Sequence, residues 1–235
     1  MTGLDDFSPA PNIAGDPATY EIENGALDRP GILWEAMRTA APWGGRVLLD
    51  LGCGTGFWLP GYAADRHPPV ALIGVEPDPE LLGPARHRDG GATVLHGSAE
   101  HLPLADSSVD VVHARFAYFW GAGSEAGLIE VRRVLRPGGA LVVVDNDHLA
   151  GDFADLLAAS GEPFALRSQD EVDAWWAAAG ATREAVLSSW QFDSRADLEA
   201  VLALEFPAGR AGPWLGAHPG ALRVSYGFLL YTLRS

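Results

Sequence analysis

Short, continuously apolar stretches alternate with amphipathic segments over residues 46–145. The apolar stretches are predicted strands, at Arg46–Asp50, Val70–Val75, Ala92–His96, Val109–Ala114 and Ala140–Asp145. Predicted helices lie between them, from the turn after the first strand to about His67, at Pro79–Arg88 and at Ser124–Arg136. A strand that is apolar on both faces has to be covered on both faces, and the helices of βαβ units provide that cover. The alternation therefore predicts an α/β fold with a doubly wound, mostly parallel sheet.

The two flanks of this alternating region have other patterns. Residues 1–19 are rich in Pro, Gly, Asp and Ala, which predicts a mobile arm, and a helix is predicted to follow over Asp28–Ala41. At the other end, a capping box formed by Ser168 and Glu171 opens a predicted helix that runs to Ala179.

The last part of the chain reads as two long strands, Thr182–Phe192 and Ala221–Leu233, with a capped helix from Ser194 to Phe206 between them. Because no simple crossover helix joins the two strands, we expect an antiparallel pair at one edge of the sheet. The chain is predicted to be a single domain, with an arm and cap helix in residues 1–43, a ligand-binding core in 44–148, and helices and edge strands in 149–235.

Composition restricts the location and the chemistry. The first residues lack the basic-then-apolar pattern of a signal peptide, and no apolar run approaches the roughly 20 residues that span a bilayer. The single cysteine, Cys53, cannot form an intramolecular disulfide, so a cytoplasmic protein is expected. A net charge of −15 disfavours nucleic acid and anionic membranes as partners. Since every basic residue is arginine, Schiff-base chemistry and a phosphate-loop lysine are excluded.

The most informative segment is the turn after the first predicted strand, Asp50-Leu51-Gly52-Cys53-Gly54-Thr55-Gly56. Glycine at every second position permits positive φ and lets a ligand approach the backbone without an intervening Cβ. Dinucleotides bind similar turns, but their motif has the spacing G-x-G-x-x-G, whereas the spacing here is G-x-G-x-G. The carboxylate of Asp50 is poorly suited to a pyrophosphate and well suited to a ligand that carries an ammonium and a sulfonium group.

A second acid, Glu76, ends the second predicted strand 20 residues after Gly56. A carboxylate at such a strand end can accept both hydroxyl groups of a ribose. By itself this arrangement fits NAD equally well, but its combination with Asp50 does not.

These residues resemble motifs of the class I S-adenosylmethionine-dependent methyltransferases that act on small molecules. The glycine turn is similar to the first motif of that family, and Glu76 to its ribose-binding acid. Three later segments resemble further motifs in the family's order, namely Gly97–Leu104 for the adenine segment, Val109–Phe116 for the fourth strand, and Arg133–Asp145 for the late motif with the fifth strand. The resemblance covers about residues 46–146.

The resemblance implies a Rossmann-like sheet of seven strands with an antiparallel last strand, and S-adenosyl-L-methionine as the cofactor, with S-adenosyl-L-homocysteine as the product. The cofactor site that we predict consists of Tyr20, Asp50, Leu51, Gly52, Cys53, Gly54, Gly56, Glu76, Pro77, Ser98, Ala99, Glu100 and Arg115. Ser98 stands where the family often has an acid, and Cys53 reads as a small packing residue.

Two of these residues have an alternative interpretation. Tyr20 resembles residues that cover the cofactor in related enzymes, but it can equally be a loop aromatic packed on the core. Arg115 either positions the substrate or the cofactor, or forms a structural ion pair with one of the many acids.

Methyl transfer is an in-line displacement, so alignment and exclusion of water matter most, and a base is needed only for a hydroxyl or a protonated amine. His113, near the carboxyl end of the fourth predicted strand, is the first candidate base, unless its side chain points into a helix layer. His148 is the second candidate. Asp145, Asp147 and His148 can also be read as metal ligands, but neighbouring loop residues converge poorly on one ion, so no metal is expected.

Aromatic residues follow the two strand ends nearest the predicted methyl position. Trp58, Tyr118 and Trp120 are predicted to line an apolar acceptor pocket, with Phe57 and Phe119 nearby, and core packing is the alternative for each.

The predicted function is methyl transfer to an O, N or C atom of a small-molecule acceptor. The alternatives are an enzyme of the same fold that binds the same cofactor without methylating, a nicotinamide-dependent oxidoreductase, and a non-catalytic binding module.

Overall fold

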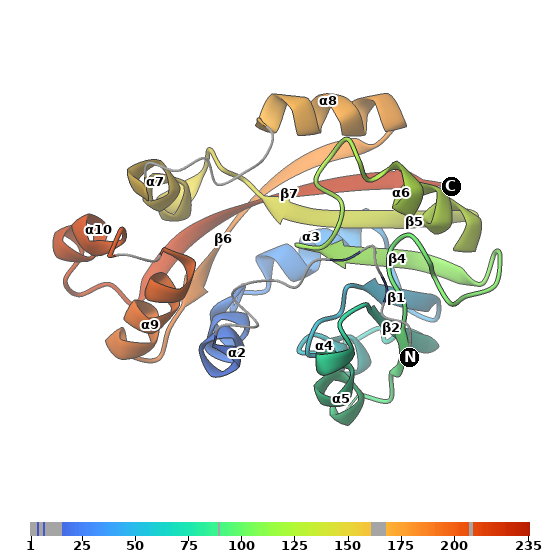
Figure 1. Ribbon diagram of the computed structural model, residues 1–235, viewed down its shortest axis with the longest axis horizontal. Helices are drawn as coiled ribbons and strands as arrows, with labels where there is room; N and C mark the ends of the chain where they lie inside the picture. Colours follow the sequence, from blue (N-terminus) through green and yellow to red (C-terminus); the bar gives the residue numbers. More distant parts are fainter. Residues whose placement is uncertain (1–3, 5–6, 8–15, 89, 161–167, 207–208) are drawn as a thin grey trace.

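The computed structural model describes residues 4, 7, 16–88, 90–160, 168–206 and 209–235, and a seven-stranded sheet forms its centre (Figure 1). The strand order is β3-β2-β1-β4-β5-β7-β6. The strands are β1 (Val47–Leu51), β2 (Ala71–Glu76), β3 (Thr93–His96), β4 (Val109–Arg115), β5 (Leu135–Asn146), β6 (Thr182–Gln191) and β7 (Arg223–Arg234).

The pairing confirms the predicted sheet. β1 is parallel to β2 and β4, β2 is parallel to β3, and β4 is parallel to β5. The last strand, β7, lies between β5 and β6 and is antiparallel to both. The two long strands predicted at the end of the chain therefore form the expected antiparallel pair at the β6 edge.

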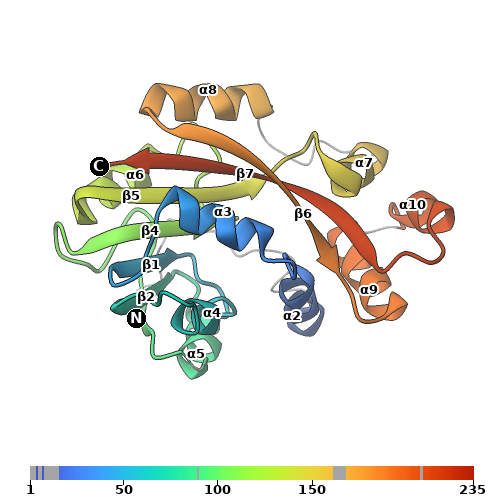
Figure 2. The same cartoon turned by 180° about the vertical axis from the view of Figure 1, so that it is seen from behind.

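Helices cover both faces of the sheet. They are α2 (Pro17–Ala26), α3 (Ile32–Ala40), α4 (Leu59–Ala63), α5 (Pro79–His87), α6 (Glu125–Val134), α7 (Gly151–Ser160), α8 (Gln169–Ala179), α9 (Arg195–Glu205) and α10 (Gly212–Ala217). α3 crosses in front of the sheet in Figure 2, whereas α6 lies in front of it in Figure 1. The predicted capping box of α8 is present, with Ser168 and Glu171 bonding each other's backbone.

Successive residues of the central strands face opposite helix layers, because side chains alternate along a strand. Val142 and Val144 of β5 belong to the core cluster that also contains the α3 residues Leu33 and Met37. Val143, between them, belongs to the second cluster, on the side of α6 and α8. The interior thus has two apolar layers, one on each face of the sheet.

Three helices, α2, α7 and α10, were not expected, and α2 is the one that reaches the glycine turn. α2 begins at Pro17, where the preceding Asp16 accepts a hydrogen bond from the backbone N–H of Thr19 at 3.1 Å. This is the usual arrangement of an acidic N-cap followed by proline in the first turn. The prediction that the arm extends to residue 19 was therefore wrong for residues 17–19. The rest of the predicted arm falls mostly outside the described residues.

The predicted helix over Asp28–Ala41 begins later, at Ile32, because Asp28 acts as a cap instead of a helical residue. Asp28 has a φ of 53°, and its carboxylate accepts the backbone N–H groups of Leu33 and Trp34 at 3.0 and 2.9 Å. Among the described residues, no helix combines the length and the apolar character needed to cross a bilayer.

Candidate active site

The glycine turn after β1 exposes its backbone at one position. Gly52, Gly54 and Gly56 have φ values of 72°, 58° and 74°, a region that residues with a side chain rarely adopt. A Cβ on Gly52 would lie 2.6 Å from the Cβ of Ala117, and a Cβ on Gly56 would lie 3.0 Å from the Cα of Ala85. A Cβ on Gly54 would meet no atom within 4 Å. Gly52 and Gly56 are therefore packed against the protein, whereas Gly54 faces open space.

Glu76 fixes this turn to the end of β2. Its Oε2 accepts the backbone N–H of Gly54 at 2.8 Å, and its Oε1 accepts that of Asp78 at 2.9 Å. The side chain is buried, and this burial raises the pKa of the Glu76 carboxyl. Because each carboxylate oxygen can accept more than one hydrogen bond, Glu76 can still accept hydroxyl groups of a ligand.

Asp50 and Arg115 form a buried ion pair at the ends of β1 and β4. Nη2 of Arg115 lies 3.0 and 2.7 Å from the two carboxylate oxygens, and the side chains are only 1% and 7% exposed. The guanidinium carbon lies 4.5 Å from the ring centroid of Trp58. Nε of Arg115 is buried and has no hydrogen-bond partner within the described part of the chain. The ion pair considered for Arg115 is thus present, and its partner is the predicted cofactor residue Asp50.

Gly54, Arg115 and Trp58 border a hollow at the carboxyl ends of β1 and β4, the edge at which open parallel sheets bind ligands, whereas Asp50 and Glu76 lie behind its lining. It is lined by Tyr20, Asn24, Cys53, Gly54, Thr55, Phe57, Trp58, Arg115 and Phe116. The structure therefore brings together predicted residues from the first helix, the glycine turn and the end of β4.

Helix α2 is bonded to the glycine turn through Glu21. Thr55 Oγ1 donates to Oε1 of Glu21 at 2.7 Å, and Arg88 forms an ion pair with the same carboxylate. Arg88 also donates from Nε to the carbonyl oxygen of Thr55 at 3.0 Å. Tyr20, the residue before Glu21, is half-buried beside the turn, and burial raises its pKa to about 12. The sequence analysis missed Glu21, Thr55 and Arg88, although Asp16-Pro17 marks the helix that carries Glu21.

His113 lies beneath the hollow, in the helix layer on the α3 side. It has no exposed surface, its Nδ1 lies 2.9 Å from the hydroxyl of Tyr62, and the ring of Trp43 packs edge-on against it at 5.3 Å. Burial lowers the pKa of His113 to about 3. A side chain without access to the hollow cannot take a proton from an acceptor. The role of base predicted for His113 is therefore corrected to packing, the alternative given for it.

His148 follows β5 at the same edge of the sheet as the hollow. It is half-buried, and burial lowers its pKa against the opposing effect of Asp147. Asp145 is also largely buried, which raises its pKa to about 6. Across the residues with described positions, no group of three or more His, Cys, Asp or Glu side chains is arranged to hold a metal ion.

The three aromatic residues that were predicted to line an acceptor pocket lie in three different places. Trp58 lines the hollow and stacks on Trp34 with ring centroids 5.7 Å apart. Tyr118 belongs instead with the opposite helix layer, where it packs on Phe119 and donates from its hydroxyl to Oε1 of Glu100 at 2.8 Å. Trp120 is 56% exposed. The prediction of an acceptor pocket is therefore corrected for Tyr118 and Trp120, which do not line the hollow.

The predicted adenine segment follows β3, next to Glu76. Ser98 and Ala99 are buried, and Ser98 Oγ accepts the backbone N–H of His101 at 3.1 Å. Glu100 is held by Tyr118, so the loop after β4 supports this segment from the side. The carbonyl oxygen of Pro77 lies 3.0 Å from Nε2 of His96, which joins the loop after β2 to the end of β3.

Leu51 and Cys53 are both buried beside the turn. The sulfur of Cys53 would lie 2.9 Å from a Cβ on Gly74, so the thiol fills the space that this glycine leaves. Burial raises the pKa of the thiol, which fits a packing residue better than a nucleophile.

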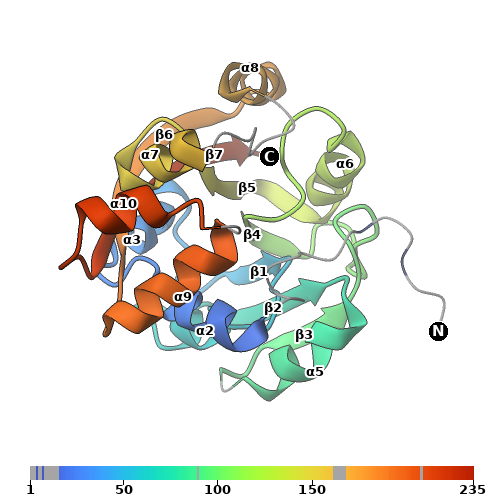
Figure 3. The ribbon, with the colours of Figure 1, turned by 60° about the vertical axis from the view of Figure 1, so that its left-hand side comes forward.

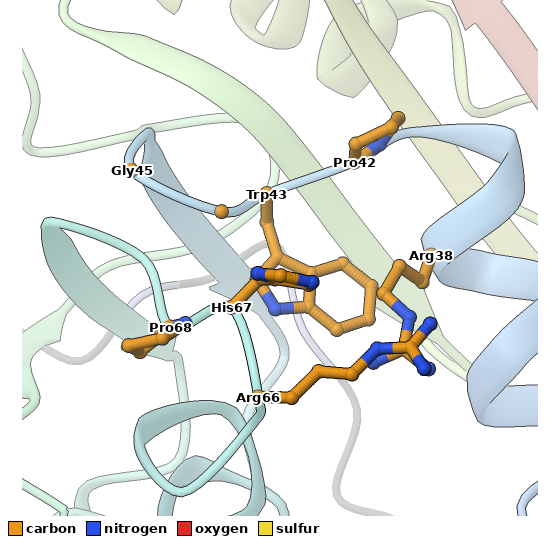
Figure 4. Close-up of a pocket in the computed structure, with 8 residues that line it drawn as sticks. Arg38, Pro42, Trp43, Gly45, Arg66, His67 and Pro68 are labelled. Atoms are coloured by element: carbon orange, nitrogen blue, oxygen red, sulfur yellow. The ribbon is translucent and has the colours of Figure 1, made fainter.

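A second hollow lies at the other edge of the sheet, before the beginnings of β1 and β2 (Figure 4). Its lining includes Trp43, His67 and the two arginines Arg38 and Arg66. Arg38 is paired with Asp65 and Glu35, and Arg66 is paired with Glu35. Because these cations already have acidic partners and lie far from the glycine turn, this hollow does not form part of the candidate site.

Residues 49–143, which include the glycine turn, Glu76 and all of β4, match the sequence profile of a family described as "Methyltransferase domain". This part of the chain is therefore similar to the class I S-adenosylmethionine-dependent methyltransferases. The resemblance noted from the motifs is confirmed by this match. S-Adenosylmethionine is accordingly the cofactor that the methyltransferase domain implies.

Relatives and solved structures agree with this assignment. An uncharacterized methyltransferase of Mycobacterium bovis is 37% identical over 140 residues, which cover 57% of this chain and 56% of that protein. The chain thus spans about half the length of the curated relatives that it matches first.

Two solved structures share the fold. One is a putative methyltransferase from an antibiotic biosynthesis pathway of Anabaena variabilis, with a TM-score of 0.60, 18% identity, and coverage of 90% of this chain and 100% of that one. The other is an S-adenosylmethionine-dependent methyltransferase of Mesorhizobium loti, with a TM-score of 0.51, 21% identity, and coverage of 86% and 97%.

Proposed function

We propose that this methyltransferase domain transfers the methyl group of S-adenosylmethionine to an O, N or C atom of a small-molecule acceptor. The observation that carries the proposal is the uncovered backbone of Gly54, which lies between the buried carboxylates of Asp50 and Glu76 at the carboxyl edge of the sheet. The open space at Gly54 leaves room for a nucleoside, and the two acids supply acceptors for its polar groups. The residues present therefore fit the cofactor.

The proposed contacts follow from the charges. The methionine end of the cofactor carries an ammonium and a carboxylate, and the Asp50–Arg115 pair offers one charge of each opposite sign. Glu76 would accept the ribose hydroxyls, and Pro77 lies beside it. Ser98, Ala99 and Glu100 would border the adenine, with Leu51, Gly52, Cys53 and Gly56 shaping the turn. Tyr20 on α2 would cover the bound nucleoside.

The chain's own contribution to methyl transfer is alignment and exclusion of water. The bound cofactor supplies a methyl group already activated by a sulfonium. Trp58, stacked against Arg115, and Tyr20 on α2 add aromatic surface to the hollow, which would help to exclude water from the bound reactants. Holding the two reactants in line can contribute about 7–11 kcal/mol to lowering the barrier. In this proposal residues 44–148 hold the cofactor, and the segments on either side enclose the acceptor.

A small acceptor is favoured by the charge of the chain and by the position of α2. A net charge of −15 repels polyanions, and α2 covers the hollow that an extended polymer would have to enter. His148, at the end of β5, stays a candidate base for an acceptor that needs one.

Binding of S-adenosylhomocysteine tests the proposal directly. Calorimetry should show binding of this nucleoside and none of NADH. Glu76→Gln should weaken the binding at least about tenfold, which corresponds to about 1.4 kcal/mol, because an amide cannot serve both ribose hydroxyls as a carboxylate does. Glu80→Gln, on the exposed side of α5, is the matched control and should bind as the wild type does. A folded protein that ignores S-adenosylhomocysteine would overturn the assignment.

A second measurement separates methyl transfer from a non-methylating reaction of the same fold. The protein is incubated with methyl-labelled cofactor and a library of small hydroxyl, amine and activated-carbon compounds. Label recovered in a product supports methyl transfer, whereas conversion of a compound without incorporation of label supports the alternative.

A further inference from the structure

The residue that follows β4 breaks the alternation of side chains along that strand. Ala114 belongs to the apolar cluster on the side of α6 and α8, and Arg115 lines the hollow. Since successive side chains of a strand face opposite sides, Phe116 is expected on the side of Ala114. Instead it lines the hollow next to Arg115, and its ring packs against Phe228 of the other cluster, with the ring centroids 6.0 Å apart. The two sides are seen in Figure 3, where α2 and α6 lie on opposite sides of β4.

A left-handed backbone causes this reversal. Phe116 has a φ of 51°, and Tyr118 has a φ of 60°. This region is unfavourable for a bulky side chain, and a residue stays in it only where the surrounding structure holds it there. Residues strained in this way gather at functional sites. Here the strain brings two successive side chains, those of Arg115 and Phe116, to the same hollow.

The loop after β4 is held by contacts on both sides of the strained residues. The backbone N–H of Phe116 donates to the carbonyl oxygen of Val144 at 2.9 Å. The carbonyl oxygen of Tyr118 accepts the hydroxyl of Ser124 at 3.0 Å, and the hydroxyl of Tyr118 donates to Glu100 at 2.8 Å. The position of Phe116 is therefore fixed by the fold.

The ring of Phe116 is supported by the protein and is still accessible. Phe116 is 37% exposed, whereas Phe228, against which it packs, has no exposed surface. A ring that the fold already holds in place loses little conformational freedom when a ligand binds. Phe116 also extends an aromatic lining, which consists of Tyr20, Phe57, Trp58 and Phe116.

The strand order separates Phe116 from the proposed contacts of the nucleoside. Glu76 ends β2, and the segment proposed for the adenine follows β3, both on one side of β1. The pair proposed for the methionine end, Asp50 and Arg115, lies at the ends of β1 and β4. Phe116 follows β4, and Phe228 belongs to β7, on the other side of β4. A molecule that lies beyond the methionine end of the cofactor would therefore meet Phe116.

We propose that Phe116 contacts the methyl acceptor and that this acceptor carries an aromatic ring. The inference rests on the proposed function and narrows its small-molecule acceptor to an aromatic one, with O, N or C still the accepting atom. Two rings that lie offset or edge-on attract each other more than their buried area alone accounts for. Phe116 thus determines specificity and takes no part in the transfer of protons.

Binding is tested by calorimetry on the full chain saturated with S-adenosylhomocysteine. The probes are three pairs that differ in the saturation of the ring, namely phenol and cyclohexanol, benzylamine and cyclohexylmethylamine, and 2-naphthol and decahydro-2-naphthol. At least one aromatic probe should bind at least about fivefold more tightly than its saturated partner. The saturated ring is the more apolar of the two, so a wall that acts by burial alone predicts the opposite order.

Two variants separate contact with the acceptor from a structural role. Phe116→Leu keeps an apolar side chain at the same backbone position but removes the ring, so it should abolish the aromatic preference and leave the affinity for S-adenosylhomocysteine unchanged. Trp120→Leu is the matched control, since Trp120 belongs to the same loop and is 56% exposed but does not line the hollow. This control should retain the preference.

The backbone strain has a test of its own. Phe116→Gly should unfold at a higher urea concentration than Phe116→Ala, because glycine adopts a left-handed φ freely and alanine does not. In regular strands and helices alanine is the more stabilising of the two. If the alanine variant is as stable as the glycine variant or more so, the fold does not force Phe116 toward the hollow, and the proposal loses its basis.

Failure of this proposal differs from failure of the proposed function. If S-adenosylhomocysteine binds but no aromatic probe exceeds its saturated partner, or if Phe116→Leu keeps the preference, the aromatic acceptor is wrong and the methyltransferase proposal stands. If S-adenosylhomocysteine itself fails to bind, the proposed function is wrong, whatever the probes do.

Discussion

Glycines that share one backbone conformation have different tasks in the turn after β1. Gly52 and Gly54 both have a left-handed φ, so alanine at either position costs about 1–2 kcal/mol of backbone strain. At Gly52 the added Cβ would also lie 2.6 Å from Ala117, whereas at Gly54 it would enter the space assigned to the cofactor. The same substitution should therefore affect stability at one position and binding at the other.

We expect Gly52→Ala to lower the free energy of unfolding clearly more than Gly54→Ala does, by about 1–3 kcal/mol more. Gly54→Ala should keep the fold and lose at least about tenfold in affinity for S-adenosylhomocysteine. Urea denaturation measures the first effect and calorimetry the second. Equal binding by Gly54→Ala and the wild type would show that the open space at Gly54 does not receive the cofactor.

The burial of His113 predicts how the free energy of unfolding changes in acid. Its pKa is about 3 in the folded protein and near 6.5 in the unfolded chain, so the unfolded chain binds the extra proton between these values. The stability contributed by the neutral imidazole is complete above pH 6.5 and is lost as the pH falls toward 3. The slope for one proton is about 1.4 kcal/mol per pH unit.

His113→Asn keeps a polar atom near the hydroxyl of Tyr62 and removes the titrating group. The variant should be less stable than the wild type at pH 8, and its free energy of unfolding should fall less steeply between pH 6 and 4 (roughly the window of the shifted pKa). Identical slopes in denaturation series at several pH values would show that His113 is not kept neutral by the fold.

Residues of the candidate site could be predicted where a short sequence motif identifies them, but not where distant segments come together only in the fold. Asp50, Glu76 and the glycines lie in two short segments whose pattern alone suggests a nucleoside. The sequence could not reveal the direction of the His113 side chain, because a one-residue shift along a buried strand exchanges the two faces. Glu21 was missed because the fold alone brings α2 to the glycine turn.

Elements with a strong apolar pattern were found almost at their observed ends. β4 was predicted over Val109–Ala114 and runs over Val109–Arg115, and α5 was predicted over Pro79–Arg88 and runs over Pro79–His87. α2 was missed because only Thr19 and Ala26 among its residues are buried, so it has little apolar periodicity. Its polar contact with the glycine turn runs through Glu21.

These polar contacts predict local behaviour of α2. Thr55→Val removes the hydroxyl that donates to Glu21 and should raise amide hydrogen exchange in α2, while exchange in β1 and β4 stays unchanged. The loss of one hydrogen bond to a charged group is expected to cost about 1.5–3 kcal/mol.

Ser194→Ala removes the N-cap of α9, the helix that packs against α2, and is a control for a general effect on neighbouring helices. This variant should raise amide hydrogen exchange in α9 more than in α2. Unchanged exchange of α2 in Thr55→Val would mean that Glu21 does not hold the helix in place.

The whole molecule carries a strong excess of negative charge, with 31 acidic and 16 basic side chains. The arginines that line the candidate site and the second hollow are already paired with acids. The remaining acidic side chains outnumber the cations that could balance them, and their mutual repulsion destabilises the folded protein. Salt should therefore stabilise this protein.

Raising sodium chloride from about 10 to about 200 mM, which shortens the screening length from about 30 to less than 10 Å, should raise Tm by about 2–5 °C. Scanning calorimetry at pH 8 measures this shift, and an equal osmolality of sucrose controls for solute exclusion. A Tm that stays constant or falls would contradict a destabilising role of the charge.

The packing of Cys53 under Gly74 has a practical consequence. The chain has no other thiol, and this one is buried with a raised pKa, so maleimides and similar reagents meet almost no background reaction on the folded protein. A cysteine introduced for the exposed Trp120 would then be the single site of attachment for a fluorophore or spin label. The position follows β4, whose last residue Arg115 lines the hollow, so a label there would serve as a probe of ligand binding.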